Sequence, residues 1–196
     1  MIPTRTRKGK GYFKMEIQQA IEIRRSIRAY GDRPVEREKL EAVLRAGNQA
    51  PIFGRLHMSV FAGPEQLQAV DAAAVAGMAR SGVPFLENLA AQEGYHPLYG
   101  AAALVVLSAP GGLDEKGFNM ANVSCAAENM LLAAAGLGLG SCFLMGPMAA
   151  FSDPALRARL ELPGGYEPLV GVALGYAALE RPVAPERTDA GITWCR

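Results

Sequence analysis

The chain has 196 residues, of which half are hydrophobic and a fifth are charged, and its formal net charge is +1. This composition is typical of one globular domain with a buried core, and it argues against nucleic acid or a membrane surface as a partner. Three cysteines and two histidines, with no CxxC pair, are too few and too widely spaced for a zinc site or a disulfide framework, so we expect no metal and a reducing, cytoplasmic setting.

Residues 1–14 form a basic segment without a long apolar run. Such a segment is neither a signal peptide nor a membrane span, and we expect it to be flexible. Met15 follows it directly, so the segment is a disordered arm, a remnant of cloning or the product of an upstream start codon. We therefore expect residues 15–196 to form the folded domain.

Helical and strand patterns alternate along the rest of the chain. Apolar residues at helical spacing predict helices over residues 16–28, 34–47, 64–78, 118–135 and 154–160. Apolar runs predict strands over residues 58–62, 101–107, 141–144 and 169–176. Residues 81–100 lack periodicity, which indicates a loop with short helical pieces. The irregular tail contains Trp194, which predicts that the tail packs on another surface, such as a partner subunit.

The first candidate site is the basic cluster Arg24-Arg25-Ser26-Ile27-Arg28, at the end of the first predicted helix. On a helix, Arg24 and Arg28 would share a face because they are four residues apart. Two guanidinium groups and a hydroxyl are suitable donors for a phosphate. A solvated basic surface is the alternative, and this short motif alone does not decide between the two interpretations.

A second cluster, the glycine-rich turn from Gly136 to Gly140, connects the long helix to the next strand. Glycine at such a turn can end a helix, and it also lets backbone N–H groups approach a planar ligand. Both interpretations remain open. The turn is not the dinucleotide-binding fingerprint, because there the glycines lie between a strand and a following helix.

Three segments, taken together and in register, resemble the nitroreductase-like flavoproteins. They are Ile21–Tyr30 with Pro34-Val35 and Ala50-Pro51, then Asn122–Leu144 with its Ala127-Glu128-Asn129-Met130, and finally Gly171–Tyr176 with a proline-rich tail that ends in Arg187. The resemblance covers roughly residues 16–196. It implies an α+β fold: a single domain with a central, mostly antiparallel sheet flanked by helices, and a C-terminal arm exchanged in a homodimer.

The resemblance also implies that the chain binds FMN. Arg24 and Ser26 match the positions that hold the FMN phosphate, and Arg25 belongs to the same cofactor-binding cluster. Arg28 matches a basic residue near the pyrimidine side of the flavin, where its charge would favour the reduced anion. Arg187 matches a C-terminal basic residue that closes on the phosphate.

Two further segments are implied to contact the flavin. The first, over one flavin face, comprises Leu144, Met145 and Gly146. The second, contributed by the other subunit, comprises Pro51, Ile52, Phe53, Gly54 and Arg55. This second loop departs from the family pattern, because Ile52 replaces a serine, Arg55 an asparagine and His57 a glutamine. Arg55 either donates a hydrogen bond to the flavin or to an acidic substrate, or it is a surface arginine.

The activity implied by the resemblance is a ping-pong reaction. NADH or NADPH would reduce FMN, and a small electron-poor acceptor of nitroaromatic or quinone type would then take its place. Two alternatives remain open. One is a flavin dehydrogenase or dehalogenase specific for one small molecule, and the other is a flavin-binding protein without turnover.

Five other residues are weaker candidates for a role in the site. We expect His57 to be a strand histidine whose hydrogen bonds are satisfied, and Cys142 to be an inert buried thiol. His96 and Tyr99 precede a buried strand, where they either overhang a ligand or, as we expect, pack against the core. Glu128 lies on an apolar helix and requires a partner that the sequence does not identify.

Overall fold

Four strands form one sheet in this computed structural model, which describes residues 15–111, 116–180, 182 and 191–195. They are β1 (His57–Phe61), β2 (Ala103–Pro110), β3 (Gly140–Leu144) and β4 (Tyr166–Gly175). The strand order is β1-β2-β4-β3, and each neighbouring pair is antiparallel. The α+β fold with a mostly antiparallel sheet is therefore confirmed, whereas residues 1–14 lie outside the described residues.

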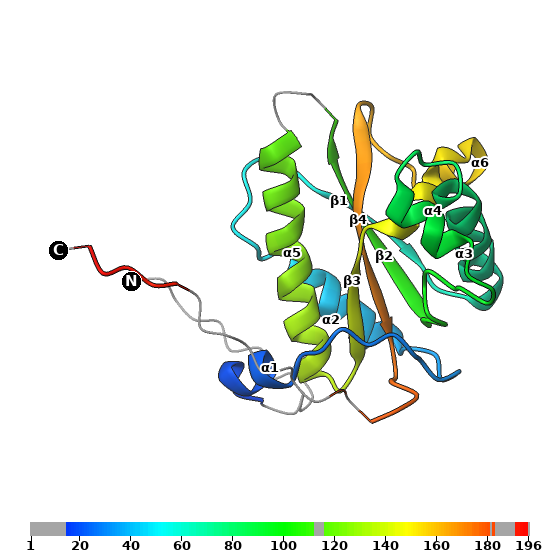
Figure 1. Cartoon of the computed structure of the whole chain (residues 1–196). Helices are drawn as coiled ribbons and strands as arrows, with labels where there is room; N and C mark the ends of the chain where they lie inside the picture. The colour runs from blue at the N-terminus through cyan, green and yellow to red at the C-terminus, as the bar shows by residue number, and fades with distance from the viewer. Residues whose placement is uncertain (1–14, 112–115, 181, 183–190, 196) are drawn as a thin grey trace.

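Helices cover both faces of this sheet (Figure 1). They are α1 (Ile17–Ile23), α2 (Arg37–Gly47), α3 (Pro64–Met78), α4 (Pro84–Ala90), α5 (Lys116–Gly136), the 3-10 helix η2 (Gly146–Ser152) and α6 (Pro154–Ala158). α2 and α5 lie on one face, and α3, η2 and α6 lie on the other (Figure 1). Within the described part of the chain, every helix is too short or too polar to cross a membrane.

The central strand β2 divides the hydrophobic core into two clusters. Ala103, Val105 and Leu107 pack with the residues of α2 and α5, whereas Leu104 and Val106 pack with those of α3 and η2. Side chains alternate between the two faces of a strand, so an uninterrupted apolar run is what a strand covered on both faces requires. The pattern over residues 101–107 predicts this strand for that reason.

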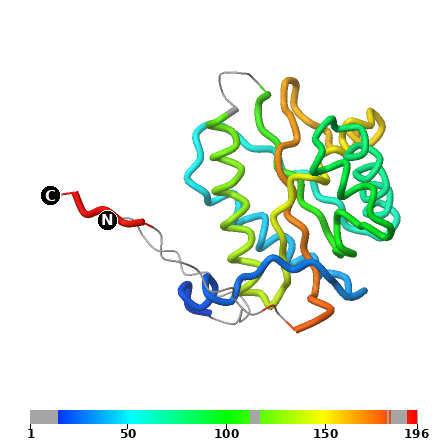
Figure 2. The backbone as a smooth tube through the Cα atoms, in the orientation of Figure 1, coloured from blue at the N-terminus to red at the C-terminus, as the bar shows by residue number. Residues whose placement is uncertain are grey.

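The first helix is shorter than predicted. The pattern over residues 16–28 predicts one helix, but α1 ends at Ile23 and Arg24 is extended, with φ −60° and ψ 126°. From there the chain crosses the end of the sheet toward α2 (Figure 2). The prediction that Arg24 and Arg28 share a helical face is therefore wrong. The physical reason is pairing with β3, because the N–H of Ile27 donates to the carbonyl of Ser141 at 2.9 Å.

The glycine-rich turn ends α5 and leaves room for a neighbouring segment. Gly138 has φ +76°, and the N–H of Leu139 donates to the carbonyl of Ala134 at 2.9 Å, as in a Schellman C-cap. A Cβ on Gly140 would lie 3.0 Å from Cγ1 of Ile27. These glycines therefore serve the helix end and the close packing of residues 24–28 on β3.

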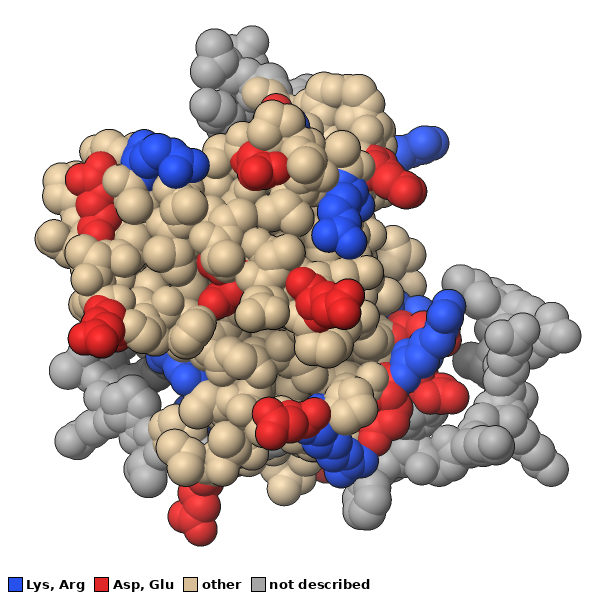
Figure 3. Space-filling view, turned by 90° about the vertical axis from the view of Figure 1, so that its right-hand side faces the viewer, with Lys and Arg blue, Asp and Glu red and all other residues tan. Residues whose placement is uncertain are grey.

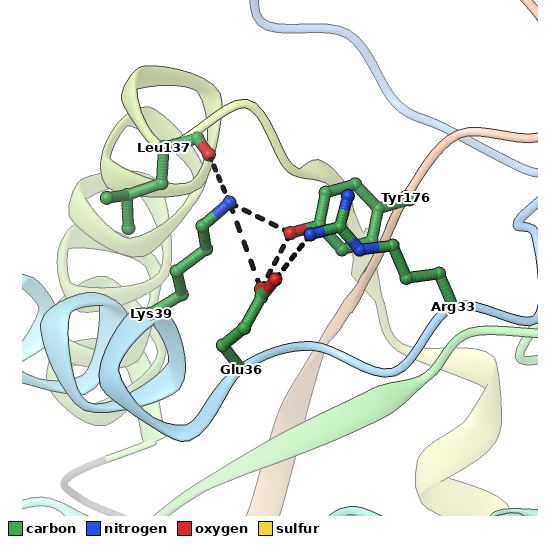
Figure 4. A network of polar contacts seen from close by, with 5 residues as sticks. All are labelled: Arg33, Glu36, Lys39, Leu137 and Tyr176. Carbon is green, nitrogen blue, oxygen red and sulfur yellow. Dashed lines mark hydrogen bonds and ion pairs between the residues drawn. The ribbon is translucent and has the colours of Figure 1, made fainter. Parts of the chain in front are cut away.

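A polar network fastens the chain before α2 to the end of β4 (Figure 4). The hydroxyl of Tyr176 donates to Glu36 at 2.6 Å, and Lys39 donates to the Tyr176 hydroxyl at 2.8 Å and to the carbonyl of Leu137 at 3.0 Å. Arg33 stacks over the Tyr176 ring, with its guanidinium carbon 4.0 Å from the ring centroid, and pairs with Glu36. This network fixes where the segment over residues 24–31 ends.

Removing the Tyr176 hydroxyl should change how the protein responds to acid. The Tyr176 hydrogen bond, with a smaller contribution from Arg33, lowers the pKa of Glu36 from 4.5 to about 2. This stabilising contribution is complete above pH 4.5 and is lost as the pH falls from 4.5 to about 2. In urea unfolding followed from neutral pH down to about pH 2, we expect Tyr176→Phe to lower the unfolding midpoint at neutral pH and to flatten the decline of that midpoint in acid. Tyr166→Phe is the control, and an unchanged decline in Tyr176→Phe would contradict the assignment.

Candidate functional site

The segment that carries the basic cluster lies in extended conformation along the outer edge of β3. Ser26 forms an isolated parallel bridge with Ser141. Because side chains alternate in extended backbone, Arg24, Ser26 and Arg28 share one side of the segment. Ile27 lies on the other side, where it is only 5% exposed and belongs to the core. The residues predicted to contact the phosphate and the ring of the cofactor are therefore neighbours. The reason is the two-residue alternation of extended backbone, not the periodicity of a helix.

The surroundings of Cys142 in β3 bring the same three side chains together. Burial raises the pKa of the Cys142 thiol, whereas the charges of Arg28 and Arg24 and a hydrogen bond with Ser26 lower it. Burial is the largest of these effects, so the thiol stays protonated and is a poor nucleophile. This agrees with the expectation that Cys142 is inert.

Arg28 lies between two hollows. The larger, here called the tyrosine cavity, has a volume of about 790 Å³, and its lining includes Arg28, Tyr30, Asp71, Tyr95, His96 and Tyr99. The smaller, of about 250 Å³, is lined by Ser26 and Arg28 and by Leu179 at the start of the tail. A ligand held by the basic cluster therefore has room on both sides of Arg28.

The tyrosine cavity has a fixed polar wall. Oδ2 of Asp71, on α3, lies 2.8 Å from Nδ1 of His96, and its Oδ1 accepts from the N–H of Leu98 at 2.8 Å. Tyr99 adopts a left-handed φ of +54° and packs edge-on against Tyr95, with the ring centroids 6.4 Å apart. His96 and Tyr99 therefore line a cavity rather than only packing against the core. Sequence reasoning missed Asp71 because it lies 25 residues from His96 and has no motif around it.

Near the predicted phosphate ligands, one arginine is paired and another has an unsatisfied donor. Nε of Arg24 lies 3.2 Å from Oε1 of Glu128 on α5. The Glu128 side chain is 53% exposed, so it pairs with Arg24 at the surface, and the expectation that it lies in apolar surroundings is wrong. Arg25 donates from Nη1 to the carbonyl of Arg24 at 2.6 Å. Nε of Arg25 and the hydroxyl of Tyr30 are buried without a hydrogen-bond partner among the described residues. Buried donors of this kind fit a ligand with several acceptor oxygens, such as FMN.

The loop from Pro51 to Arg55 lies away from the basic cluster within one subunit. It leads into β1, whereas the cluster pairs with β3, and these strands are the opposite edges of the sheet. Asn122 of α5 holds the loop, accepting from the N–H of Phe53 at 3.1 Å and donating to its carbonyl at 2.7 Å. Phe53 is 84% exposed, and Arg55 lines a separate hollow of about 190 Å³.

The remaining predicted residues are distributed around the sheet. Leu144 ends β3 and is buried, Met145 is 56% exposed, and Gly146 begins η2. His57 has its Nε2 at 3.0 Å from the carbonyl of Leu160, as expected of a satisfied strand histidine. Arg187 lies outside the described residues. Among the residues that the structure describes, no three His, Cys, Asp or Glu side chains form a cluster suited to a metal ion.

Comparisons with known proteins agree on one relationship. Residues 21–176 match the family described as the Nitroreductase family. An Archaeoglobus fulgidus protein with the provisional name NADH dehydrogenase/NAD(P)H nitroreductase is 32% identical over 171 residues, which cover 85% of this chain and 88% of that protein. A Bacteroides fragilis nitroreductase crystallised with bound FMN is similar in structure, with a TM-score of 0.79, 29% identity and coverage of 93% of this chain and all of that one. An FMN-bound nitroreductase from Desulfitobacterium hafniense shares the fold, with a TM-score of 0.80, 24% identity and the same coverage.

Replacing Asn122 with alanine should loosen the Pro51–Arg55 loop. The substitution removes both hydrogen bonds to Phe53 and should cost about 1–2 kcal/mol of unfolding free energy. Hydrogen exchange at the amide of Phe53, followed by mass spectrometry, should become faster. The matched control is Asn129→Ala, which removes a single hydrogen bond to Ala46 and should leave the loop unchanged. Unaltered exchange at Phe53 in Asn122→Ala would show that these two hydrogen bonds do not hold the loop.

Proposed function

Because the chain belongs to the Nitroreductase family, we propose that it is an oxidoreductase that binds FMN and uses NADH or NADPH to reduce a small electron-poor acceptor. The Bacteroides relative binds FMN, and the name of the Archaeoglobus relative includes NAD(P)H, which supports this proposal. The observation that carries it is the gathering of Arg24, Ser26 and Arg28 on one side of an extended segment, with Arg28 lining two hollows. A nitroaromatic or quinone is the proposed class of acceptor.

The phosphate of FMN would bind at the start of the basic segment. Arg24 and Ser26 supply a guanidinium and a hydroxyl there. Arg25, on the opposite side of the extended segment, donates from Nη1 to the carbonyl of Arg24 and is proposed to support that residue from behind. Glu128 contacts Arg24 through Nε, the inner nitrogen of the guanidinium, so the two terminal nitrogens can face a phosphate. Arg187 is proposed to complete the phosphate site from the tail.

The ring system of FMN would lie beside Arg28. When bound, FMN would supply the hydride-transfer chemistry that such an oxidoreductase needs. Arg28 would place a fixed positive charge against the pyrimidine side, and Leu144, Met145 and Gly146 would cover one face of the ring. The protein's own part is therefore to orient the ring and to offset its charge, which requires no nucleophile–base pair.

We further propose that residues 15–196 form one domain that works as a homodimer with an exchanged C-terminal arm. The arm supports this, because residues 191–195 extend from the body (Figure 1), with Ile192 73% and Trp194 85% exposed. Phe118, on α5, and Phe53, which Asn122 of α5 holds, are also exposed, at 69% and 84%. In contrast, the face over α3, α4 and α6 carries scattered acidic and basic side chains (Figure 3). Free thiols at Cys125, Cys142 and Cys195 support the proposed reducing, cytoplasmic setting.

The visible absorbance spectrum tests the proposed function directly. We expect the purified protein to show an oxidised flavin spectrum that bleaches when NADH or NADPH is added without oxygen, and recovers when menadione, a quinone, is added. A flavin that neither nucleotide reduces would favour a flavin-binding protein without turnover. A protein that binds no flavin, even after incubation with FMN, would exclude the proposal.

Substitutions at Arg24 and Glu128 test the phosphate site. Arg24→Ala should weaken FMN binding by about 10- to 100-fold, because it removes a charge-assisted contact of about 1.5–3 kcal/mol. Glu128→Gln keeps an acceptor for Nε of Arg24 but removes a negative charge, so FMN should bind roughly two- to fivefold more tightly. Riboflavin, which lacks the phosphate, is the control ligand in fluorescence titrations. Equal changes for FMN and riboflavin would contradict a phosphate site at Arg24.

Light scattering during size-exclusion chromatography tests the dimer. We expect a mass of about twice the 20.8 kDa of one chain. The double substitution Ile192→Ala and Trp194→Ala should raise the dimer dissociation constant by about tenfold or more, because it truncates two large apolar contacts. Phe85→Ala, which truncates an apolar side chain that is 69% exposed on α4, is the control. A monomer that retains flavin would contradict the two-subunit site.

A further inference from the structure

The hydroxyl of Tyr30 has no explanation in the packing of the protein. Tyr30 is 9% exposed, and its hydroxyl oxygen is buried without a hydrogen-bond partner among the described residues. Phenylalanine would fill the same space without placing an unsatisfied donor in the core. An unpartnered buried donor that lines a cavity points to a ligand in that cavity, and Tyr30 lines the tyrosine cavity.

The ring of Tyr30 is fixed in place, so its hydroxyl cannot easily turn to another partner. The backbone of Tyr30 bridges to Ala177 just after β4. A Cβ on Gly175 would lie 2.7 Å from Cδ1 of Tyr30, which shows how closely the ring packs on the strand. Burial raises the pKa of Tyr30, with Arg28 opposing the shift, so the hydroxyl remains protonated near neutral pH and acts as a donor.

The rest of the cavity wall indicates the chemistry of the ligand. Arg28 is a second donor, and its charge acts on both Tyr30 and Tyr95. Tyr99 adds an aromatic surface to the cavity wall, and Leu98 adds an aliphatic one. Two donors that line one cavity beside aromatic surface suit a planar, conjugated ring with a carbonyl oxygen.

We propose that the Tyr30 hydroxyl and the Arg28 guanidinium bind a ring carbonyl oxygen of a planar conjugated ligand in the tyrosine cavity. This inference rests on the proposed function, because such an enzyme would bind two ligands of this chemistry. One is the flavin, whose pyrimidine ring carries carbonyl groups, and the other is a quinone acceptor. Tyr30 is in either case a ligand-binding residue to which the resemblance assigns no role.

Tyr30→Phe is the test, with Tyr166→Phe as the matched control for the loss of a hydroxyl elsewhere. If the flavin is the ligand, Tyr30→Phe should weaken FMN and riboflavin equally, by about five- to tenfold in fluorescence titrations. This differs from Arg24→Ala, which should weaken FMN alone. If the acceptor is the ligand, flavin affinity should be unchanged. The KM for menadione should then rise by a similar factor, while the rate with ferricyanide, which has no carbonyl group, should not change.

The ligand-free protein provides an independent readout. Because Phe removes an unsatisfied buried donor, the melting temperature of flavin-free Tyr30→Phe should equal or exceed that of the wild type. A lower melting temperature would show that the hydroxyl has a structural partner and would overturn the proposal. A flavin affinity and a KM for menadione that both stay within twofold of the wild type would also overturn the proposal. If the wild type binds no flavin, the proposed function fails, and calorimetric binding of menadione to wild type and Tyr30→Phe still decides whether Tyr30 binds a carbonyl.

Discussion

The backbone pairing of residues 24–31 with the edge of the sheet is the constraint on which the candidate site depends. The N–H of Ile27 donates to Ser141 in β3, and the N–H of Gly31 donates to Tyr176 after β4, both at 2.9 Å. These hydrogen bonds hold the segment in extended form and place alternate side chains on the same side. Helical backbone would turn Ser26 away from Arg24, whereas extended backbone brings both to the same side.

Strand order decides which parts of the site one subunit can supply. β1 and β3 are opposite edges of a four-stranded sheet, so their axes lie about 14 Å apart at a strand spacing of about 4.8 Å. The Pro51–Arg55 loop enters β1, and the basic cluster follows β3. The resemblance assigns both to one flavin, so under the proposed function a second copy of the chain would have to supply the loop.

Much of the fold could be predicted from the sequence, because long periodic patterns of apolar residues indicate which side chains are buried. The pattern over residues 64–78 coincides with α3, and the apolar run at residues 101–107 locates β2 to within a few residues. The first helix was predicted too long because its periodicity continues through Ile27, which is buried by pairing with β3 rather than by a helical face. η2 was missed because a seven-residue 3-10 turn has no pattern of its own.

The candidate site was predicted where side chains are adjacent in sequence and missed where only tertiary structure brings them together. Arg24, Ser26 and Arg28 belong to one motif, so the resemblance identifies them even though the periodicity argument was wrong. The wall of the tyrosine cavity joins α3 to the chain before β2, through Asp71 and His96. Those contacts depend on the packing of whole elements, and no local pattern in the sequence specifies them.

The altered loop changes how a flavin would be held. His57 replaces the family's glutamine, but its Nε2 contacts the carbonyl of Leu160 in its own subunit. Ile52 cannot donate a hydrogen bond from its side chain, so Arg55 is the remaining polar side chain among the three altered positions. Phe53, clamped by Asn122 and 84% exposed, offers an aromatic surface instead. Under the proposed function, polar recognition of the cofactor would therefore come mainly from the extended segment and the tyrosine cavity, and the loop would provide apolar contact and a single positive charge.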